Sequence, residues 1–278
     1  MSETGQRTAK GTARQAADSE TMKYAARAGF AARGVIHLLI GVLAMQIAVG
    51  GGGKSADQGG ALAEIAEKPF GKVLLWALGI GLIAMALWQL SEALFGSVGP
   101  DGHKPRKRLL AGALFVFYGF VSYSVLAFAV GSKSSGGNSS DKESQDVTAR
   151  AMELPAGRWL VGVVALVIVG SGVWIAIQAA RRKYHKEMKM GEMSRRTRQL
   201  VDVTGVGGGV ARGLVFAVAG GFALAAAVTY DSDKAKGMDD TIRSFRETPV
   251  GPWLLVALAV GLILFGVFSF AMARWRKL

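Results

Sequence analysis

The chain has 278 residues, of which 51% are hydrophobic and 19% are charged, and its 33 Lys and Arg against 20 Asp and Glu give a net charge of +13. Soluble globular proteins carry about 25% charged residues, more than this chain. The low charge content and the mean hydropathy of +0.32 together exclude a disordered tail and disfavour a soluble nucleic-acid-binding domain. The absence of cysteine from the sequence excludes disulfides, thiolate metal sites and cysteine nucleophiles.

Six stretches of the chain are apolar over about 20 residues, the length that a helix needs to cross a hydrocarbon core about 30 Å thick. Lipid offers no partner to open backbone groups, so we expect these stretches to be helices. The hydrophilic first 29 residues do not have the pattern of a cleaved signal peptide, so we expect the first span to be a retained anchor. The expected spans are 30–49, 73–95, 109–131, 159–180, 210–230 and 253–275.

The predicted organisation has five parts in chain order. A cytoplasmic basic N-terminal arm (1–29) precedes a first repeat (30–96), and a second repeat (105–181) follows. A basic cytoplasmic linker (182–204) then leads to a third repeat (205–278).

The distribution of charge predicts the orientation. The termini, the 96–108 loop, the 181–212 linker and Glu92 at the end of the second span lie on one side, with 22 basic and 8 acidic residues, a net charge of +14. The alternate loops hold 11 basic and 12 acidic residues, a net charge of −1. The positive-inside rule therefore predicts that both termini are cytoplasmic, in contact with anionic lipid headgroups, and nucleic-acid binding is not expected.

A threefold repeat of one two-helix unit runs through the sequence. Each copy contains Glu-x-Pro-x-Gly before its second helix, Gly-x₆-Gly in its first helix, and a large aromatic residue 17 positions after the first motif's glycine. Two crossings per copy give parallel units, so we expect pseudo-threefold symmetry about the membrane normal. The copies are Glu67, Pro69, Gly71, Gly34, Gly41 and Trp88; Glu153, Pro155, Gly157, Gly112, Gly119 and Trp174; and Glu247, Pro249, Gly251, Gly213, Gly220 and Phe268.

These motifs have structural interpretations. Glycines seven apart share a helix face and let a neighbouring helix approach closely. We expect each proline to begin the second helix of its unit, with the preceding glutamate favouring the positive end of the helix dipole. An alternative is a ring of three carboxylates, Glu67, Glu153 and Glu247, that attracts a cation.

Four ionisable residues near or within spans are further candidates. Arg33 and Arg212 share an Ala-Arg-Gly motif, and we expect Arg33 to extend to the membrane surface. His37 occupies a position that is Phe in the other two repeats, which favours packing over a proton or ligand role. Glu92 lies one turn from a helix end, where Arg108 or another arginine is an expected ion-pair partner.

The first repeat resembles a bacterial membrane-protein family that is common in actinobacteria. The resemblance rests on Gly29-Phe-Ala-Ala-Arg33-Gly34-Val35, Gly60-Ala61-Leu62, Pro69-Phe70-Gly71-Lys72-Val73, Gly81-Leu82 and Trp88. The family is catalogued as domain of unknown function 1206, its members have tandem two-helix units, and the resemblance covers about residues 24–275. It implies a bacterial plasma-membrane location and supplies no activity or catalytic residues.

No catalytic constellation can be assembled within the spans, and the three histidines lack metal-ligand spacing, so we expect neither an enzyme nor a cofactor. The first functional hypothesis is a non-catalytic scaffold or accessory subunit that binds lipid or a protein partner, with an axis filled by apolar side chains. The alternative is a small-ion or small-solute channel or transporter whose path lies on the pseudo-threefold axis. Short amphipathic helices at 61–67, 147–152 and 238–245 are expected to cover the outer end of the bundle.

Overall fold

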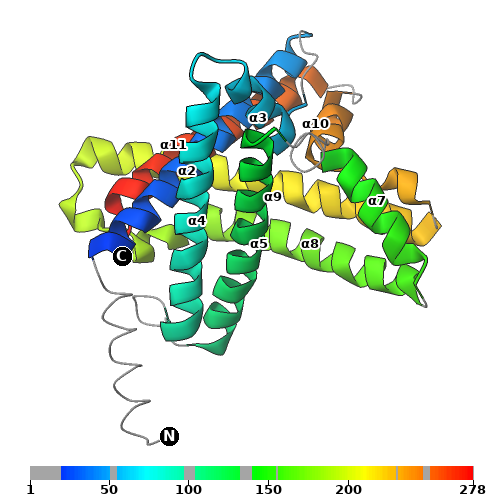
Figure 1. Cartoon of the computed structure of the whole chain (residues 1–278), viewed down its shortest axis with the longest axis horizontal. Helices are drawn as coiled ribbons and strands as arrows, with labels where there is room; N and C mark the ends of the chain where they lie inside the picture. The colour runs from blue at the N-terminus through cyan, green and yellow to red at the C-terminus, as the bar shows by residue number, and fades with distance from the viewer. Residues whose placement is uncertain are drawn as a thin grey trace, which may run out of the picture.

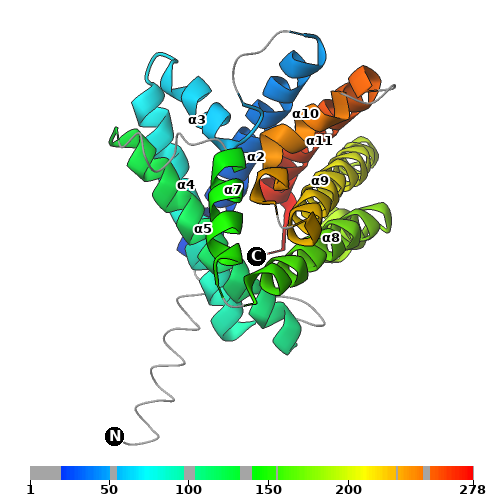
Figure 2. The same ribbon diagram turned by 90° about the vertical axis from the view of Figure 1, so that its right-hand side faces the viewer.

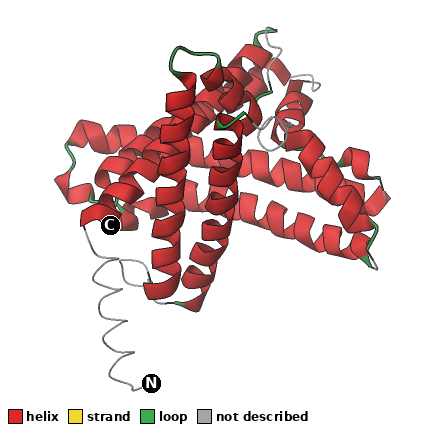
Figure 3. Cartoon of the chain, viewed as in Figure 1, coloured by secondary structure: helices red, strands yellow, loops and turns green. Residues whose placement is uncertain are grey.

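The computed structural model describes residues 20–50, 55–96, 104–131, 140–154, 156–229, 231–246 and 251–277. Within these ranges every regular element is a helix, as Figure 3 shows, and the only β pairing is an isolated bridge between Met188 and Arg276. Six of the helices are long and apolar enough to cross a membrane. The expected all-α class with six membrane-spanning helices is therefore confirmed.

The six long helices follow the six apolar stretches of sequence. The longest, α9, has 35 residues, so it extends about 52 Å and exceeds a hydrocarbon core of about 30 Å by several turns. The second half of the basic linker is therefore helical. The long helices are α2 (Glu20–Ala48), α4 (Gly71–Phe95), α5 (Pro105–Ala129), α8 (Gly157–Ala180), α9 (Arg195–Thr229) and α11 (Gly251–Trp275).

Three short helices lie at one end of the bundle, each just before α4, α8 or α11. They are α3 (Gln58–Ala66), α7 (Ser140–Met152) and α10 (Met238–Arg246). They confirm the short helices expected there, although α3 and α7 begin earlier than predicted. We call this end the cap face, and the opposite end, where α2, α5 and α9 begin, the terminal face.

The long helices pack as three antiparallel pairs, α4–α5, α8–α9 and α11–α2, and each pair joins neighbouring repeats (Figure 1). Two junctions within repeats are also packed, α2 on α4 and α9 on α11. At the third junction, α5 and α8 make no comparable contact in the described part of the chain. The ring of six helices is therefore open between α5 and α8, and Figure 2 shows the α4–α5 and α8–α9 pairs diverging, with α7, which packs on α8 and α10, in front of the opening.

The second glycine of the Gly-x₆-Gly motif explains the close packing of two of these pairs. A Cβ atom added to Gly41 of α2 would lie 2.7 Å from the Ile263 side chain of α11. One added to Gly220 of α9 would lie 2.7 Å from the backbone nitrogen of Val169 in α8. The equivalent Gly119 of α5 has nothing within 4 Å of such an atom.

The first glycine of the motif behaves in the same way. A Cβ atom on Gly34 would lie 2.8 Å from the Phe270 ring, and one on Gly213 would lie 2.6 Å from the carbonyl oxygen of Gly172. On Gly112 the nearest atom would be 4.0 Å away. The packing interpretation therefore holds for the first and third repeats and is wrong for the second, whose helix α5 does not approach its neighbour as closely.

The glycine of Glu-x-Pro-x-Gly is the residue that begins each second helix, as Gly71, Gly157 and Gly251 show. A Cβ atom on Gly71 would overlap the carbonyl oxygen of Ile65 at the end of α3. One on Gly157 would overlap the corresponding carbonyl oxygen at the end of α7. In these two copies the motif therefore needs glycine because a short helix ends against the first residue of a long one.

The turn itself differs from the expected one. Pro69 lies two residues before α4 and not within its first turn, so the expectation that proline begins the helix is wrong in this copy. The residue after the proline, Phe70 or Ala156, has φ near +60° and serves as the helix N-cap without a side-chain hydrogen bond. Pro155 and Pro249 lie outside the described residues.

Candidate functional site

Two adjoining cavities lie among the long helices, and we call them together the central cavity. One, of about 260 Å³, extends to the terminal face, and the other, of about 130 Å³, lies on its cap side. Both are lined by Arg33, Tyr118 and Arg212, which mark their junction. Gln58 of α3 and Met238 of α10 line its cap-side end.

The repeat places three equivalent positions on this cavity. Arg33 and Arg212 each occupy the middle of Ala-Arg-Gly, and Ala111 replaces the arginine in the second repeat. All three residues line the larger part of the cavity. Because the following glycine packs tightly against a neighbouring helix in the first and third repeats, the arginine beside it is directed inward.

Arg33 is held inside the bundle by α11. Its Nε donates to Ser269 Oγ at 3.2 Å, a terminal nitrogen lies 3.3 Å from Met272 Sδ, and its guanidinium covers the rings of Phe30 and Phe265. The expectation that Arg33 extends to the membrane surface is therefore wrong. Interior hydrogen-bond and aromatic partners replace water around this cation.

Arg212 is less satisfied than Arg33. Its Nε is fully buried and has no hydrogen-bond partner, while its guanidinium lies 4.9 Å from the Phe265 ring centroid and 5.3 Å from that of Phe216. Within the described ranges neither Arg33 nor Arg212 forms an ion pair with a carboxylate. Both guanidinium groups lie over the Phe265 ring, and two buried cations near each other without an anion between them are costly in a protein interior, so this arrangement would favour a bound anion.

Tyr118 and His37 complete the junction. Tyr118 lines both parts of the cavity, and its hydroxyl interacts with the Arg33 guanidinium. His37 Nδ1 donates to the backbone oxygen of Arg33 at 2.9 Å, and its ring packs edge-on against Phe265 with centroids 4.8 Å apart. His37 thus packs as the aromatic residue that the repeat predicts, although it also lines the cavity.

The terminal end of the cavity carries both signs of charge. Lys107 and Arg276 line it together with Glu92 and Glu187, and Arg276 is paired with Glu187 at 3.2 Å. With Arg33 and Arg212, four basic side chains face two acidic ones. The cavity therefore has a net positive charge that favours entry of an anion.

Of the arginines expected near Glu92, Arg108 has other partners. Arg108 donates to the carbonyl oxygens of Ala93 and Leu94 at 2.8 and 2.9 Å, so it caps the end of α4. Arg276, another arginine, lines the same cavity as Glu92. Gln89, one turn earlier, has a buried side-chain oxygen without a hydrogen-bond partner and lines the same cavity.

The proposed carboxylate ring lies elsewhere. Glu67 and Glu153 follow the last turns of α3 and α7, are exposed, and do not line the central cavity. Glu67 is the C-cap of α3, so it is not placed as an N-terminal residue of α4. Glu247 lies outside the described residues.

The aromatic residues of the three repeats have different environments. Trp88 is buried against Phe30 and the Arg276 guanidinium, and it lines the central cavity. Phe268 is buried and packs against Tyr184 of the linker, whereas Trp174 is 59% exposed. Only the first copy therefore contributes to the candidate site.

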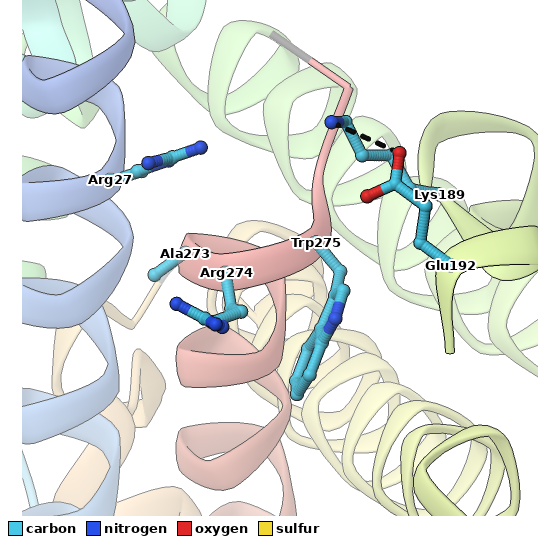
Figure 4. Close-up of a pocket in the computed structure, with 6 residues that line it drawn as sticks. All are labelled: Arg27, Lys189, Glu192, Ala273, Arg274 and Trp275. Carbon is cyan, nitrogen blue, oxygen red and sulfur yellow. Dashed lines mark ion pairs between the residues drawn. The ribbon is translucent and has the colours of Figure 1, made fainter. Parts of the chain in front are cut away.

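A second pocket, of about 390 Å³, opens on the terminal face. Figure 4 shows Arg27 and the end of α11 on one side of this pocket, and Lys189 and Glu192 of the linker on the other. Lys189 and Glu192 form an ion pair with each other at 3.3 Å. Its basic side chains fit contact with lipid phosphates, but none of them is buried. It is lined by Arg27, Lys189, Glu192, Ala273, Arg274 and Trp275.

The linker is fastened to α9 and to the end of α11. Asp202 accepts from the Tyr184 hydroxyl at 3.1 Å, pairs with Arg182 at 3.3 Å and also contacts His185. Burial and the adjacent carboxylate raise the pKa of Tyr184. The linker includes the 3₁₀ turns η1 (Lys183–Glu187) and η2 (Met190–Glu192), and this cluster fixes it so that Glu187 reaches the central cavity.

Sequence reasoning missed Tyr118, Phe265 and Arg276. Tyr118 lies six residues after Gly112, on a face that the repeat gave no reason to single out. Arg276 was counted only as part of a basic tail. The amino-acid composition of the tail cannot predict that Arg276 lies against the helix bundle and lines the central cavity.

The fold and site define a multi-pass membrane protein with three tandem two-helix repeats around a charged interior cavity. The chain belongs to the DUF1206 family, described as a Domain of Unknown Function, which matches residues 28–96, 111–182 and 207–276. The three matches confirm the expected family and its three repeats. The chain is also similar to the uncharacterized protein YxxB of Bacillus subtilis (strain 168), with 29% identity over 243 residues that cover 87% of each chain. No solved structure matches it.

Proposed function

We propose that the protein is a membrane transport protein whose substrate carries an anionic group, bound in the central cavity between Arg33 and Arg212. The observation that carries this proposal is the pair of interior arginines that have no carboxylate partner among the described residues, one of which has a buried Nε without a hydrogen-bond partner there. A bound carboxylate or phosphate would accept from both guanidinium groups, as such groups commonly do.

The cavity favours this function over a scaffold. A scaffold or accessory subunit was expected to have an interior filled by apolar side chains. The central cavity of this protein is instead lined by polar and charged side chains, namely Arg33, Arg212, Tyr118 and Gln89. The sign of the charge also disfavours a cation path. A scaffold role that binds a protein partner stays a hypothesis for the cap and terminal faces, and nothing in the cavity supports catalysis.

The structure suggests how access is arranged. The cavity reaches the terminal face past Lys107 and Arg276, and Gln58 and Met238 lie at its cap-side end. In this conformation a ligand enters from the terminal face. Transport would then require α3 and α10 to separate on the cap side.

We also propose that the terminal face is cytoplasmic and that the membrane is a bacterial plasma membrane. The difference of charge between the two sides supports the orientation, with +14 on the terminal side and −1 on the other. The relative from Bacillus subtilis supports a bacterial membrane. The basic terminal face, including the pocket of Figure 4, then contacts anionic lipid headgroups.

A thermal-shift experiment tests the anion site. Purified protein is heated with phosphate, and with chloride at equal ionic strength, and tryptophan fluorescence reports unfolding. Phosphate should raise the Tm of the wild type and of Arg181→Gln, an exposed arginine outside the cavity. It should have no such effect on Arg212→Gln, because the ligand's principal cation is gone. No phosphate effect on the wild type, or an equal effect on Arg212→Gln, would overturn the proposal.

A further inference from the structure

An apolar groove, which we call the lateral groove, adjoins the central cavity on the side where the ring is open. Its volume is about 540 Å³, and α7, α8, α9 and the residues before α10 form its walls. Val161, Val164 and Ile168 of α8 face Val215, Phe216 and Ala223 of α9 across it. Val164 is 49% exposed, so the groove is open to its surroundings.

The lateral groove and the central cavity share part of their walls. Val215, Phe216 and Met238 line both the groove and the cap-side part of the cavity. Val215 and Phe216 lie one turn beyond Arg212 on α9, and the Arg212 guanidinium covers the Phe216 ring. The charged site therefore continues directly into an apolar one.

The open junction explains why the protein itself does not fill this groove. At the two closed junctions, α2 packs on α4 and α9 packs on α11. Between α5 and α8 the described chain supplies no comparable contact, and the groove-lining Leu160 and Val164 of α8 are half exposed, so the groove is open at the surface of the helix bundle. A molecule dissolved in the bilayer can enter from the side without crossing either membrane surface.

The length of the groove fits one lipid leaflet. From Arg212 to Ala223 the helix rises about 16 Å, and half of a hydrocarbon core about 30 Å thick is about 15 Å. Arg212 lies 17 residues from the last residue of α9, so about 25 Å of helix remains on its cap side. The arginine thus lies near the headgroup depth of the terminal-face leaflet, and the groove extends from it toward the cap face as an acyl chain does.

We infer that the ligand is an anionic phospholipid, with its phosphate between Arg33 and Arg212 and one acyl chain in the lateral groove. This inference rests on the proposed function and names the substrate class of the same site. The phosphate accepts from the two guanidinium groups, and the Tyr118 hydroxyl donates to it. The chain buries the apolar walls of the groove, and the second chain stays in the bilayer beside α5.

Native mass spectrometry of the purified full-length protein tests the inference with phosphatidylglycerol as the probe. Long-chain phosphatidylglycerol should be retained at least about tenfold better than phosphatidylcholine of the same chains, and better than dihexanoyl phosphatidylglycerol. Val164→Trp, which fills the groove, should lower this retention about tenfold or more. Val163→Trp is the matched control, because Val163 is exposed on α8 and does not line the groove.

The outcomes separate the two proposals. If Val164→Trp and Val163→Trp retain the lipid equally, or if phosphatidylcholine is retained as strongly as phosphatidylglycerol, the lipid inference is wrong. The anion site would still be supported if the effect of phosphate on the Tm depends on Arg212. If Arg212→Gln changes neither lipid retention nor the phosphate effect, the anion site itself is wrong. Ala223→Leu fills the groove from α9 and serves if Val164→Trp does not fold.

Discussion

The second glycine of Gly-x₆-Gly provides a test of packing in which the three repeats serve as one another's controls. Gly220→Ala places a methyl group 2.7 Å from the backbone nitrogen of Val169 and 2.9 Å from one of its methyl carbons. The neighbour is backbone, so the α8–α9 pair must separate. Overpacking costs about 1–3 kcal/mol, and replacing a helical glycine by alanine returns about 0.5–1 kcal/mol.

The mid-values of these two ranges give a net loss of about 1 kcal/mol for Gly220→Ala, which corresponds to a fall in Tm of about 2–4 °C. Gly41→Ala should behave similarly. Gly119→Ala has no atom within 4 Å to displace, so only the helix-propensity gain remains and the Tm should rise slightly. Tryptophan fluorescence during heating in lipid-containing micelles measures all three. A fall in Tm for Gly119→Ala as large as that for Gly220→Ala would refute the reasoning.

Two carboxylates away from the cavity lead to further predictions. Asp202→Ala should lower the Tm by a few degrees, because it removes the acceptor of Tyr184 and His185, and this loss costs about 1–2 kcal/mol of stability. Proteolysis of the linker should also become faster, and an unchanged cleavage rate would contradict this prediction. Asp239→Ala should leave the buried amide of Ala56 without its 2.7 Å acceptor and speed its hydrogen exchange, and slow exchange of that amide in the variant would show that the contact is unimportant.

The fold was largely predictable because the bilayer restricts the choice. An apolar stretch of about 20 residues that must satisfy its own backbone can only be a helix, so the six long helices followed from the sequence. The repeat added the three short helices at one end. The same pattern could not predict the opening between α5 and α8, because a helix that faces lipid and a helix that faces another helix are both apolar.

The candidate site was predictable only in part. Arg33, Arg212 and Glu92 were singled out as ionisable residues near or within spans, and all three line the central cavity. Their direction was not predictable, because an arginine near a helix end can extend to the surface or turn inward, and the choice depends on neighbours such as Ser269 that lie far away in the sequence. The glutamates of the repeat were conspicuous in the sequence for their regularity, yet Glu67 and Glu153 lie at turns outside the cavity.

The open junction also determines how the protein responds to its membrane. Where two helices interlock, side chains set their separation, but α5 and α8 make no comparable contact in the described part of the chain, and their pairs diverge (Figure 2). The distance between these helices therefore depends on the lateral pressure and thickness of the surrounding bilayer. Membranes with shorter acyl chains or more conical lipids will change the width of this one seam, while the two sealed junctions keep theirs.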